Sequence, residues 1–192
     1  MILQENNFIP LRNCNVYGEN ICAVPERLSS SHRPLLEQFS CGNTVIDNFF
    51  KYTAEESVLD SAYVFIDYER NALAAAASSA CSSLQIMDNG HYYDSVPAVE
   101  IKYFAVDVRY QRLRFSAERE EGYFSDAVLS ALIGFIYKFT DDYCAATRIL
   151  LYSTPDAVHV YERNGFVKLS DSGIMVRHNH FLDGCTPMIL PL

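Results

Sequence analysis

The most informative stretch of the sequence is Val99–Phe166. It ends in Tyr152-Ser-Thr-Pro-Asp-Ala-Val-His-Val-Tyr-Glu-Arg-Asn-Gly-Phe166. Within this string, Thr154 can cap a helix, and Pro155 suits the first helical position, where its missing N–H costs nothing. Gly165 suits the position just past a helix end, because that residue often adopts positive φ. Together these signals predict a helix of about nine residues.

Upstream of this helix the pattern predicts a strand, a polar loop, a helix and a second strand. The strand Val99–Val108 is apolar on both faces after Lys102, as expected of a central strand that is covered on both sides. After the charged segment Arg109–Gly122, Ser125 can cap a helix whose body is apolar nearly all round and which we therefore expect to be buried. Thr147–Tyr152 is the predicted second buried strand.

The alternation of strands and helices predicts a mixed α/β domain with helices on the faces of its sheet. We expect a single domain over residues 1–192, since domains commonly run roughly 100–200 residues. The remaining predicted elements are a strand Ile21–Pro25, a loop Arg27–Pro34, a helix from Asn43 or Thr44 to about Glu56, a hairpin of Ala62–Tyr68 and Ala72–Leu84, a strand pair Phe166–Leu169 and Gly173–Val176, and a last strand or arm Thr186–Leu192.

The composition excludes several classes of protein. A formal net charge of −9 disfavours nucleic-acid binding, which needs a basic surface to neutralise phosphates. No stretch approaches the roughly 18 apolar residues that a membrane span requires, and the start lacks the pattern of a secretory signal. We therefore expect a soluble, cytoplasmic protein.

The cysteines and histidines show no metal-binding spacing. His178 and His180 form an i, i+2 pair that lacks the spacing of a usual ligand set, so no metal is expected. Because an α/β chain of this size does not need disulfides, we expect reduced and mostly buried thiols. The six cysteines are Cys14, Cys22, Cys41, Cys81, Cys144 and Cys185.

Arginines are concentrated between the predicted central strand and the helix that follows it. Arg109, Arg112, Arg114 and Arg119 lie there, at a helix N-terminus whose free N–H groups and dipole attract anions. Guanidinium groups add forked donors that match phosphate oxygens, so the junction could hold a pyrophosphate. The alternative is a solvated loop whose arginines pair with the neighbouring glutamates, and the residues alone leave both open.

Three segments carry a resemblance to a known family. Ala105-Val-Asp-Val-Arg-Tyr-Gln111 and Ala157–Phe166 resemble the core of the GNAT superfamily of N-acetyltransferases. Phe39-Ser-Cys-Gly-Asn43, followed by a helix, resembles the acceptor-side segment of that superfamily, particularly of its bacterial toxin-like branch. The resemblance implies an acyl-CoA N-acyltransferase-like fold, with a mixed and mainly antiparallel central sheet flanked by helices. It also implies direct transfer of acetyl from acetyl-CoA to a primary amine of a small molecule or peptide.

The resemblance also implies which residues hold the cofactor. The backbone of Phe104, Ala105 and Val106 would pair with the pantetheine arm, and Ser153 or Thr154 would contact it as well. The pyrophosphate would be held by Gln111, Arg112 and Arg114, together with backbone amides up to Ser125.

The phosphate loop departs from the family pattern. Superfamily loops carry glycines that let backbone amides approach the pyrophosphate, whereas Gln111–Gly122 is longer and nearly glycine-free. Either the loop still cradles the phosphates around an insertion, or the grip is lost. Arginines at 112 and 114 favour retention, because they replace neutral donors by charged ones.

Two residues are candidates for proton transfer. The superfamily commonly places a general-acid tyrosine where Tyr161 stands, and a phenol there could protonate the departing CoA thiolate. Glu100 could deprotonate the incoming ammonium, or it could be an exposed carboxylate at a strand end. Cys41 has no adjacent base in the sequence, so we expect no nucleophilic role for it.

Two other functions stay open. The first is a toxin-like enzyme that acetylates aminoacyl-tRNA and is restrained by an antitoxin; the Phe39–Asn43 segment suggests this reading and the net charge argues against it. The second is a non-catalytic acyl-CoA-binding domain, which the glycine-poor loop permits. A homodimer also stays open.

Overall fold

The computed structural model describes residues 25–88, 91–113, 122–172 and 184–192, with side chains left out of the description at 85–88 and 91–94. Several predictions lie outside these residues. They concern most of the strand Ile21–Pro25, the strand Gly173–Val176, the residues Arg114 and Arg119, the pair His178 and His180, and the cysteines Cys14 and Cys22.

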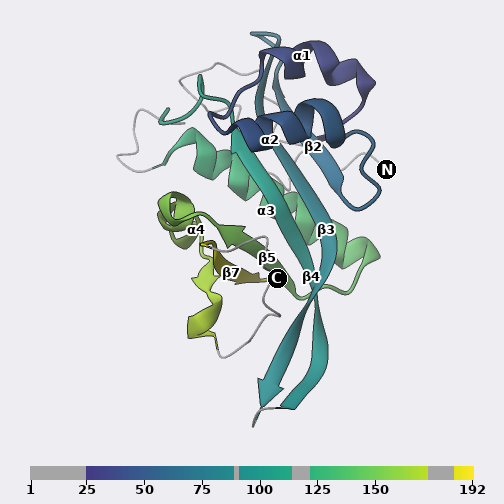
Figure 1. Cartoon of the computed structure of the whole chain (residues 1–192), viewed down its shortest axis with the longest axis vertical. Helices are drawn as coiled ribbons and strands as arrows, with labels where there is room; N and C mark the ends of the chain where they lie inside the picture. The colour runs from purple at the N-terminus through teal and green to yellow at the C-terminus, as the bar shows by residue number, and fades with distance from the viewer. Residues whose placement is uncertain (1–24, 89–90, 114–121, 173–183) are drawn as a thin grey trace. The chain divides into compact units, whose positions relative to one another are not determined.

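The described strands form a seven-stranded sheet in the order β1-β2-β3-β4-β5-β7-β6 (Figure 1). Strands β4 and β5 pair in parallel, whereas the pairs β1–β2, β5–β7 and β6–β7 are antiparallel. The mixed, mainly antiparallel sheet and the central place of β4 are therefore confirmed. The strand bounds are Glu26–Arg27 (β1), Ser61–Asp67 (β2), Ala72–Asp88 (β3), His91–Val106 (β4), Arg148–Ser153 (β5), Val167–Lys168 (β6) and Thr186–Pro191 (β7).

The chain divides into two compact units, and each is built from two stretches of sequence. The first unit comprises the residues up to Ser78 together with Tyr103–Ile136, and the second comprises Ser79–Lys102 and Tyr137–Leu192. Strands β3 and β4 each contribute residues to both units. That the whole chain is one domain stays a prediction.

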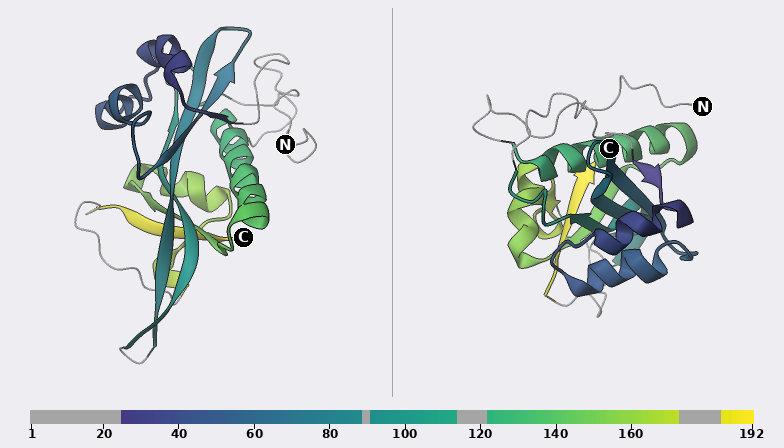
Figure 2. Two further views of the ribbon diagram at one scale, coloured as in Figure 1. Left: turned by 90° about the vertical axis from the view of Figure 1, so that its right-hand side faces the viewer. Right: turned by 90° about the horizontal axis from the view of Figure 1, so that it is seen from above.

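In the first unit, helices lie on both faces of the strands. Helices α1 (Arg33–Gln38) and α2 (Thr44–Asn48) lie on one face, and the first part of α3 (Phe124–Tyr143) lies on the other (Figure 2). Ring contacts mark the two sides: Tyr63 meets Phe135 of α3 with centroids 4.9 Å apart, and Phe49 meets Tyr103 at 4.5 Å. The buried core of this unit includes Leu36, Phe39, Phe50, Val64, Leu73, Ala76 and Ala105.

The predicted loop Arg27–Pro34 is wrong in its second half. A 3-10 turn over Ser30–His32 leads directly into α1, and the Ser29 N–H donates to His32 Nδ1 at 3.1 Å. Pro34 lies in the first turn of α1, where proline is pre-set for helix. The polar residues that suggested a loop therefore serve as a helix start.

The cap at Asn43 is confirmed. Asn43 Oδ1 accepts from the N–H groups of Val45 and Ile46, at 3.0 and 3.3 Å. After α2 the backbone widens into a π turn over Phe49–Thr53, so the helical run ends about three residues before the predicted Glu56. The turn buries Phe50, whose ring meets that of Phe39 edge-on at 6.3 Å.

Two predictions about α3 are wrong, one of them only in part. The helix begins at Phe124, so Ser125 lies inside its first turn, and the cap contact comes from Asp126, which accepts from the Tyr123 N–H at 3.1 Å. The second prediction, burial, holds for the body of the helix, at Val128, Leu129, Leu132 and Ile136, and fails near its end, where Tyr137 and Tyr143 are 56% and 69% exposed. Tyrosine tolerates such positions because its hydroxyl remains solvated.

The second unit contains the helix predicted from the closing string. A 3-10 turn over Pro155–Ala157 continues into α4 (Val158–Arg163), and Gly165 ends it with a φ of +88°. Thr154 occupies the cap position without a side-chain hydrogen bond. The predicted last strand is confirmed as β7, whereas Phe166–Leu169 forms only the short β6 before a 3-10 turn at Leu169–Asp171.

Both hairpin strands are confirmed, and β3 extends past the predicted Leu84 to Asp88. The alanines Ala74–Ala77 are completely buried, which explains how a run of weak strand formers stays extended. In the part of the chain that is described, no helix is long and apolar enough to cross a membrane.

Replacing Asn43 by alanine should lower the free energy of unfolding by about 1 kcal/mol, because two N–H groups at the start of α2 lose their acceptor. Urea denaturation would measure the change. Asn43→Asp keeps the acceptor oxygen and is the control, with stability close to wild type. An alanine variant as stable as wild type would show that packing of the π turn alone holds this helix.

Candidate active site

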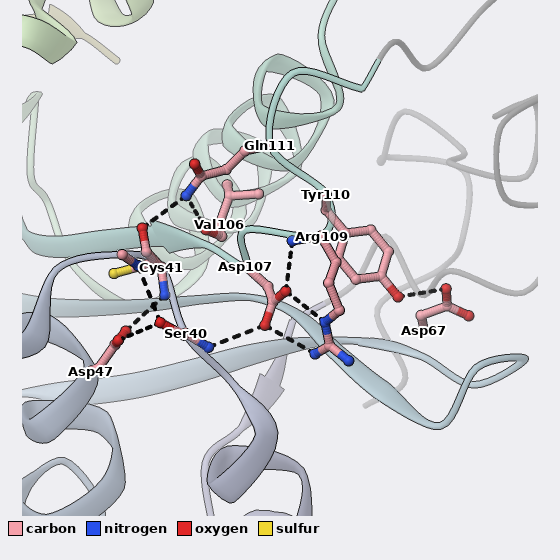
Figure 3. Close-up of polar contacts among 10 residues, drawn as sticks. Ser40, Cys41, Asp47, Asp67, Val106, Asp107, Arg109, Tyr110 and Gln111 are labelled. Carbon is pink, nitrogen blue, oxygen red and sulfur yellow. Dashed lines mark hydrogen bonds and ion pairs between the residues drawn. The ribbon is translucent and has the colours of Figure 1, made fainter.

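Asp107 follows the last residue of β4 and is completely buried. Its carboxylate accepts from the guanidinium of Arg109 at 2.7 and 2.9 Å, from the Arg109 N–H at 2.9 Å, and from the Ser40 N–H at 3.1 Å (Figure 3). The Asp107 N–H in turn donates to Ala74 O of β3 at 2.9 Å. Arg109 of the predicted phosphate-binding cluster is therefore already paired, and its bonds to Asp107 raise the pKa of the guanidinium.

The peptide groups of Ser40 and Cys41 are held at every polar atom. The Ser40 N–H binds Asp107, and its carbonyl accepts from the Val108 N–H at 2.8 Å. The Cys41 N–H donates to Asp47 at 2.8 Å, and its carbonyl accepts from Gln111 Nε2 at 2.9 Å. Three of these four bonds come from residues 107–111, so the segment that resembles an acceptor site is fixed against the turn after β4.

Asp47 supports the same segment from α2. Its carboxylate accepts from the Ser40 hydroxyl at 2.7 Å and from the Cys41 N–H at 2.8 Å. Burial by itself would raise the pKa of Asp47, but the hydrogen bonds from Cys41 and Ser40 outweigh it and hold the pKa below the ordinary value. The ionised form is thus the one that the fold uses.

A third buried carboxylate, Asp67, anchors the turn on β2. It accepts from the Tyr110 hydroxyl at 2.8 Å and from the N–H and guanidinium of Arg70, each at 3.0 Å. Burial, followed by the hydrogen bond to Asp67, raises the pKa of Tyr110. The turn is therefore tied to β2 as well as to the acceptor-side segment.

The thiol of Cys41 is not activated. Burial raises its pKa to about 11, so it stays protonated at neutral pH and is a poor nucleophile. The four described cysteines are free thiols, as predicted, but the expectation of mostly buried thiols is wrong for them, because Cys81 is exposed and the other three are half-buried. The described residues contain no group of three or more His, Cys, Asp or Glu that could hold a metal ion.

The predicted phosphate ligands differ in how many of their hydrogen-bond donors are already used within the protein. Gln111 donates its side-chain amide to Val106 O and Cys41 O, at 2.8 and 2.9 Å, and its backbone N–H to Asp107 O at 3.1 Å. Arg112 is exposed, and among the described residues its guanidinium makes no hydrogen bond or ion pair. Its φ of +64° lies in the left-handed region that non-glycine residues rarely adopt.

The other predicted cofactor contacts of the first unit lie around these residues. Phe104, Ala105 and Val106 form the end of β4, and the Val106 carbonyl is already used by Gln111. Ser125 is half-buried in the first turn of α3. Arg114 lies outside the described residues.

The second unit holds the predicted proton donor. The ring of Tyr161 lies edge-on to Phe166 with centroids 5.8 Å apart. Burial raises the pKa of Tyr161 to about 12, and among the described residues its hydroxyl has no hydrogen-bond partner. Ser153 is buried, and its hydroxyl donates to Thr154 O at 2.8 Å, so this donor is already used.

Glu100 also belongs to the second unit. It pairs with Leu150 across the parallel β4–β5 ladder, is half-buried, and so is not the exposed strand-end carboxylate of the alternative reading. Tyr152 lies two residues along β5 on the same face. Burial, and next the charge of Glu100, raise the pKa of Tyr152.

The structure thus gathers the candidates into two groups. Glu100, Ser153 and Tyr161 belong to the second unit, and the other described candidates belong to the first. Sequence reasoning missed the three buried carboxylates, although Asp107 directly follows the predicted central strand and stands two residues before an arginine. An acidic residue at the end of a buried strand can indicate such a carboxylate when an arginine stands close by, since a buried charge must be paired.

Comparisons with known proteins give the fold a precedent. No family model matches the sequence, and no curated protein matches it. Among solved structures, one named as a bacterial toxin is 22% identical, with a TM-score of 0.66 over 89% of this chain and 90% of that one. The chain has the fold of this toxin.

Two further structures share that fold. AtaT complexed with acetyl-methionyl-tRNAfMet is 12% identical, with a TM-score of 0.65 over 89% of this chain and 94% of that one. AtaTR bound with acetyl-CoA is 12% identical, with a TM-score of 0.62 over 90% and 93%. The predicted acyl-CoA N-acyltransferase-like fold is thereby confirmed.

Asp47→Asn should remove part of the pH dependence of stability. Because the folded pKa of Asp47 is depressed, its contribution is present above the unfolded value of about 3.9 and is lost as the pH falls through the folded pKa. The variant should lose about 1–3 kcal/mol at pH 7 and approach wild type at low pH. Urea denaturation between pH 2 and 7 would measure this, with the exposed Asp141→Asn as control. A constant difference across the pH range would assign the loss to packing.

Proposed function

We propose that the chain is an acetyl-CoA-dependent N-acetyltransferase of the toxin type, whose acceptor is the amino group of an aminoacyl-tRNA. The proposal is supported by a fold shared over about nine-tenths of both chains with AtaT, a toxin solved with acetyl-methionyl-tRNAfMet. AtaTR is solved with acetyl-CoA. This precedent favours the charged-tRNA acceptor over the small-molecule or peptide amine that the resemblance first implies.

The observation that carries the proposal is the Tyr161 hydroxyl, which has no hydrogen-bond partner among the described residues. In the reaction the amine attacks the thioester carbonyl, the C–N bond forms, the C–S bond breaks, and CoA leaves as a thiolate that needs a proton. A phenol with a pKa of about 12 keeps its proton at neutral pH, and its transfer becomes favourable as the C–S bond breaks in a dry site, where the forming thiolate is strongly basic. Structures of Tyr-to-Phe variants of the toxin AtaT and of KacT are among the structural neighbours.

The cofactor would be held chiefly by the first unit. The guanidinium of Arg112 has no partner among the described residues, and Arg114 is the second cation that we propose for the pyrophosphate. The backbone of Phe104, Ala105 and Val106 would pair with the pantetheine arm, with Ser153 also contacting it. Glu100 would take the proton from the acceptor ammonium.

The acidic surface sets how tRNA would be bound. With a net charge of −9, the chain would neutralise few phosphates, so affinity should depend only weakly on salt. An antitoxin partner belongs to the same proposal, because AtaT is solved bound to the C-terminus of the antitoxin AtaR. Acetyl-CoA binding without transfer would identify the chain as a non-catalytic acyl-CoA-binding domain.

Acetyl-CoA should raise the melting temperature, because a ligand bound only by the native state adds about 2.7 kcal/mol at a hundredfold excess over Kd. The double change Arg112→Glu and Arg114→Glu should abolish the rise and leave the unliganded melting temperature unchanged. Differential scanning fluorimetry measures both. Arg27→Glu, a charge reversal elsewhere in the first unit, should retain the rise. An unaltered rise in the double variant would place the phosphates elsewhere.

Tyr161→Phe should lower kcat about 100-fold or more while leaving the Kd of acetyl-CoA unchanged, since only the proton donor is removed. Stability should stay within about 1 kcal/mol, because the hydroxyl has no partner among the described residues. The assay follows N-acetyl-aminoacyl-adenosine by mass spectrometry after incubating acetyl-CoA with a pool of charged tRNAs.

Tyr68→Phe, on the exposed β2–β3 turn, is the matched control and should react as wild type does. A Tyr161→Phe variant with wild-type turnover would assign the proton to water or another residue. Wild-type protein that binds acetyl-CoA but acetylates no charged tRNA would overturn the acceptor that we propose.

A further inference from the structure

We propose that Gln111 is a positioning residue that locks the acceptor segment, defined as Ser40–Asn43, onto the turn that binds acetyl-CoA. The inference rests on the proposed function for the names of the two substrates, but its geometry lies entirely within the first unit. It replaces the role on the pyrophosphate that sequence resemblance implies for Gln111.

The geometry leaves Gln111 no donor for a phosphate. An amide NH₂ has two hydrogens, and here one goes to Val106 O at 2.8 Å and the other to Cys41 O at 2.9 Å (Figure 3). The backbone N–H of Gln111 donates to Asp107 O at 3.1 Å. A phosphate could claim a Gln111 donor only by displacing one of these carbonyls.

The bond to Cys41 is the last along the acceptor segment that joins it to the turn after β4, because Gly42 donates to the Ser40 hydroxyl at 3.3 Å and Asn43 is bonded to α2. Asp107 and Asp47 hold Ser40 and the Cys41 N–H, whereas the Cys41 carbonyl is held by Gln111. The next residue, Gly42, is exposed and has a φ of +86°. Removing the Gln111 amide would therefore release the Cys41 carbonyl from the turn, while the carboxylate bonds and the Asn43 cap persist.

Adjacent residues of the turn thus have opposite tasks. Gln111 directs its donors to carbonyls of the protein, whereas the exposed guanidinium of Arg112 has no partner among the described residues. Substitutions at the two positions should separate binding of the two substrates, which a general loosening of the turn would not do.

The experiment compares Gln111→Met, which keeps the shape and removes both donors, with Arg112→Gln. Gln111→Met should raise KM for charged tRNA about tenfold, the effect of losing two neutral hydrogen bonds, and leave the Kd of acetyl-CoA within about twofold. Arg112→Gln should do the reverse. Gln111→Glu also removes both donors and should likewise raise KM for charged tRNA, but its negative charge beside Arg112 would in addition weaken acetyl-CoA binding.

A second measurement does not depend on catalysis. The alkylation rate of Cys41 by iodoacetamide, followed by peptide mass spectrometry, should rise several-fold in Gln111→Met, because the peptide that carries this half-buried thiol loses its bond to the turn. The exposed Cys81 is the internal control and should react at its wild-type rate.

The outcomes separate the two proposals. If Kd for acetyl-CoA and KM for tRNA rise together in Gln111→Met, Gln111 serves the cofactor or the turn as a whole, and the inference is overturned. It is also overturned if Cys41 alkylation and KM both stay at wild-type values. If wild type acetylates no charged tRNA and yet Gln111→Met accelerates Cys41 alkylation, the acceptor that we propose is wrong. The positioning role of Gln111 on the acceptor segment is then still supported.

Discussion

A buried charge must be paired, and in the first unit this constraint acts through Asp107. Its carboxylate, completely buried at the end of β4, takes hydrogen bonds from a backbone N–H of the acceptor segment and from both the backbone and guanidinium of Arg109. Removing one partner of such a pair would leave an uncompensated charge in the core. The turn after β4 and the segment before α2 must therefore keep the same relation in every folded molecule.

This arrangement separates polar groups that maintain the fold from groups that remain for chemistry. Arg109, Gln111 and Tyr110 all point their donors at other parts of the first unit. In the described residues, the guanidinium of Arg112 and the hydroxyl of Tyr161 have no such engagement. A polar side chain that has no internal partner, in a molecule that satisfies most others, is a reasonable place to look for a substrate.

Arg112 has a left-handed backbone conformation, in a loop that is nearly glycine-free. A non-glycine residue in that conformation costs about 1–2 kcal/mol, a cost usually avoided by glycine. Here the position carries a charged donor instead. If the turn binds the pyrophosphate as we propose, a guanidinium takes the place of backbone amides there, with backbone strain as the cost.

The sequence by itself determined the order of elements, because hydrophobic periodicity and cap signals are local. Asn43 capping α2 and Gly165 ending α4 could be read from neighbours a few residues away. The start of α1 was missed, since the same polar residues that favour a loop can also begin a helix.

Only the tertiary structure decided which polar residues are hydrogen-bonded within the protein. Gln111 and Cys41 are 70 residues apart in sequence, and Asp107 and Ser40 are 67 apart. No local pattern reports such pairings, because they arise when the chain packs and each buried donor or acceptor takes the partner that geometry offers. Sequence resemblance therefore assigned Gln111 to a phosphate, whereas the fold assigns its donors to the protein and leaves the neighbouring arginine available.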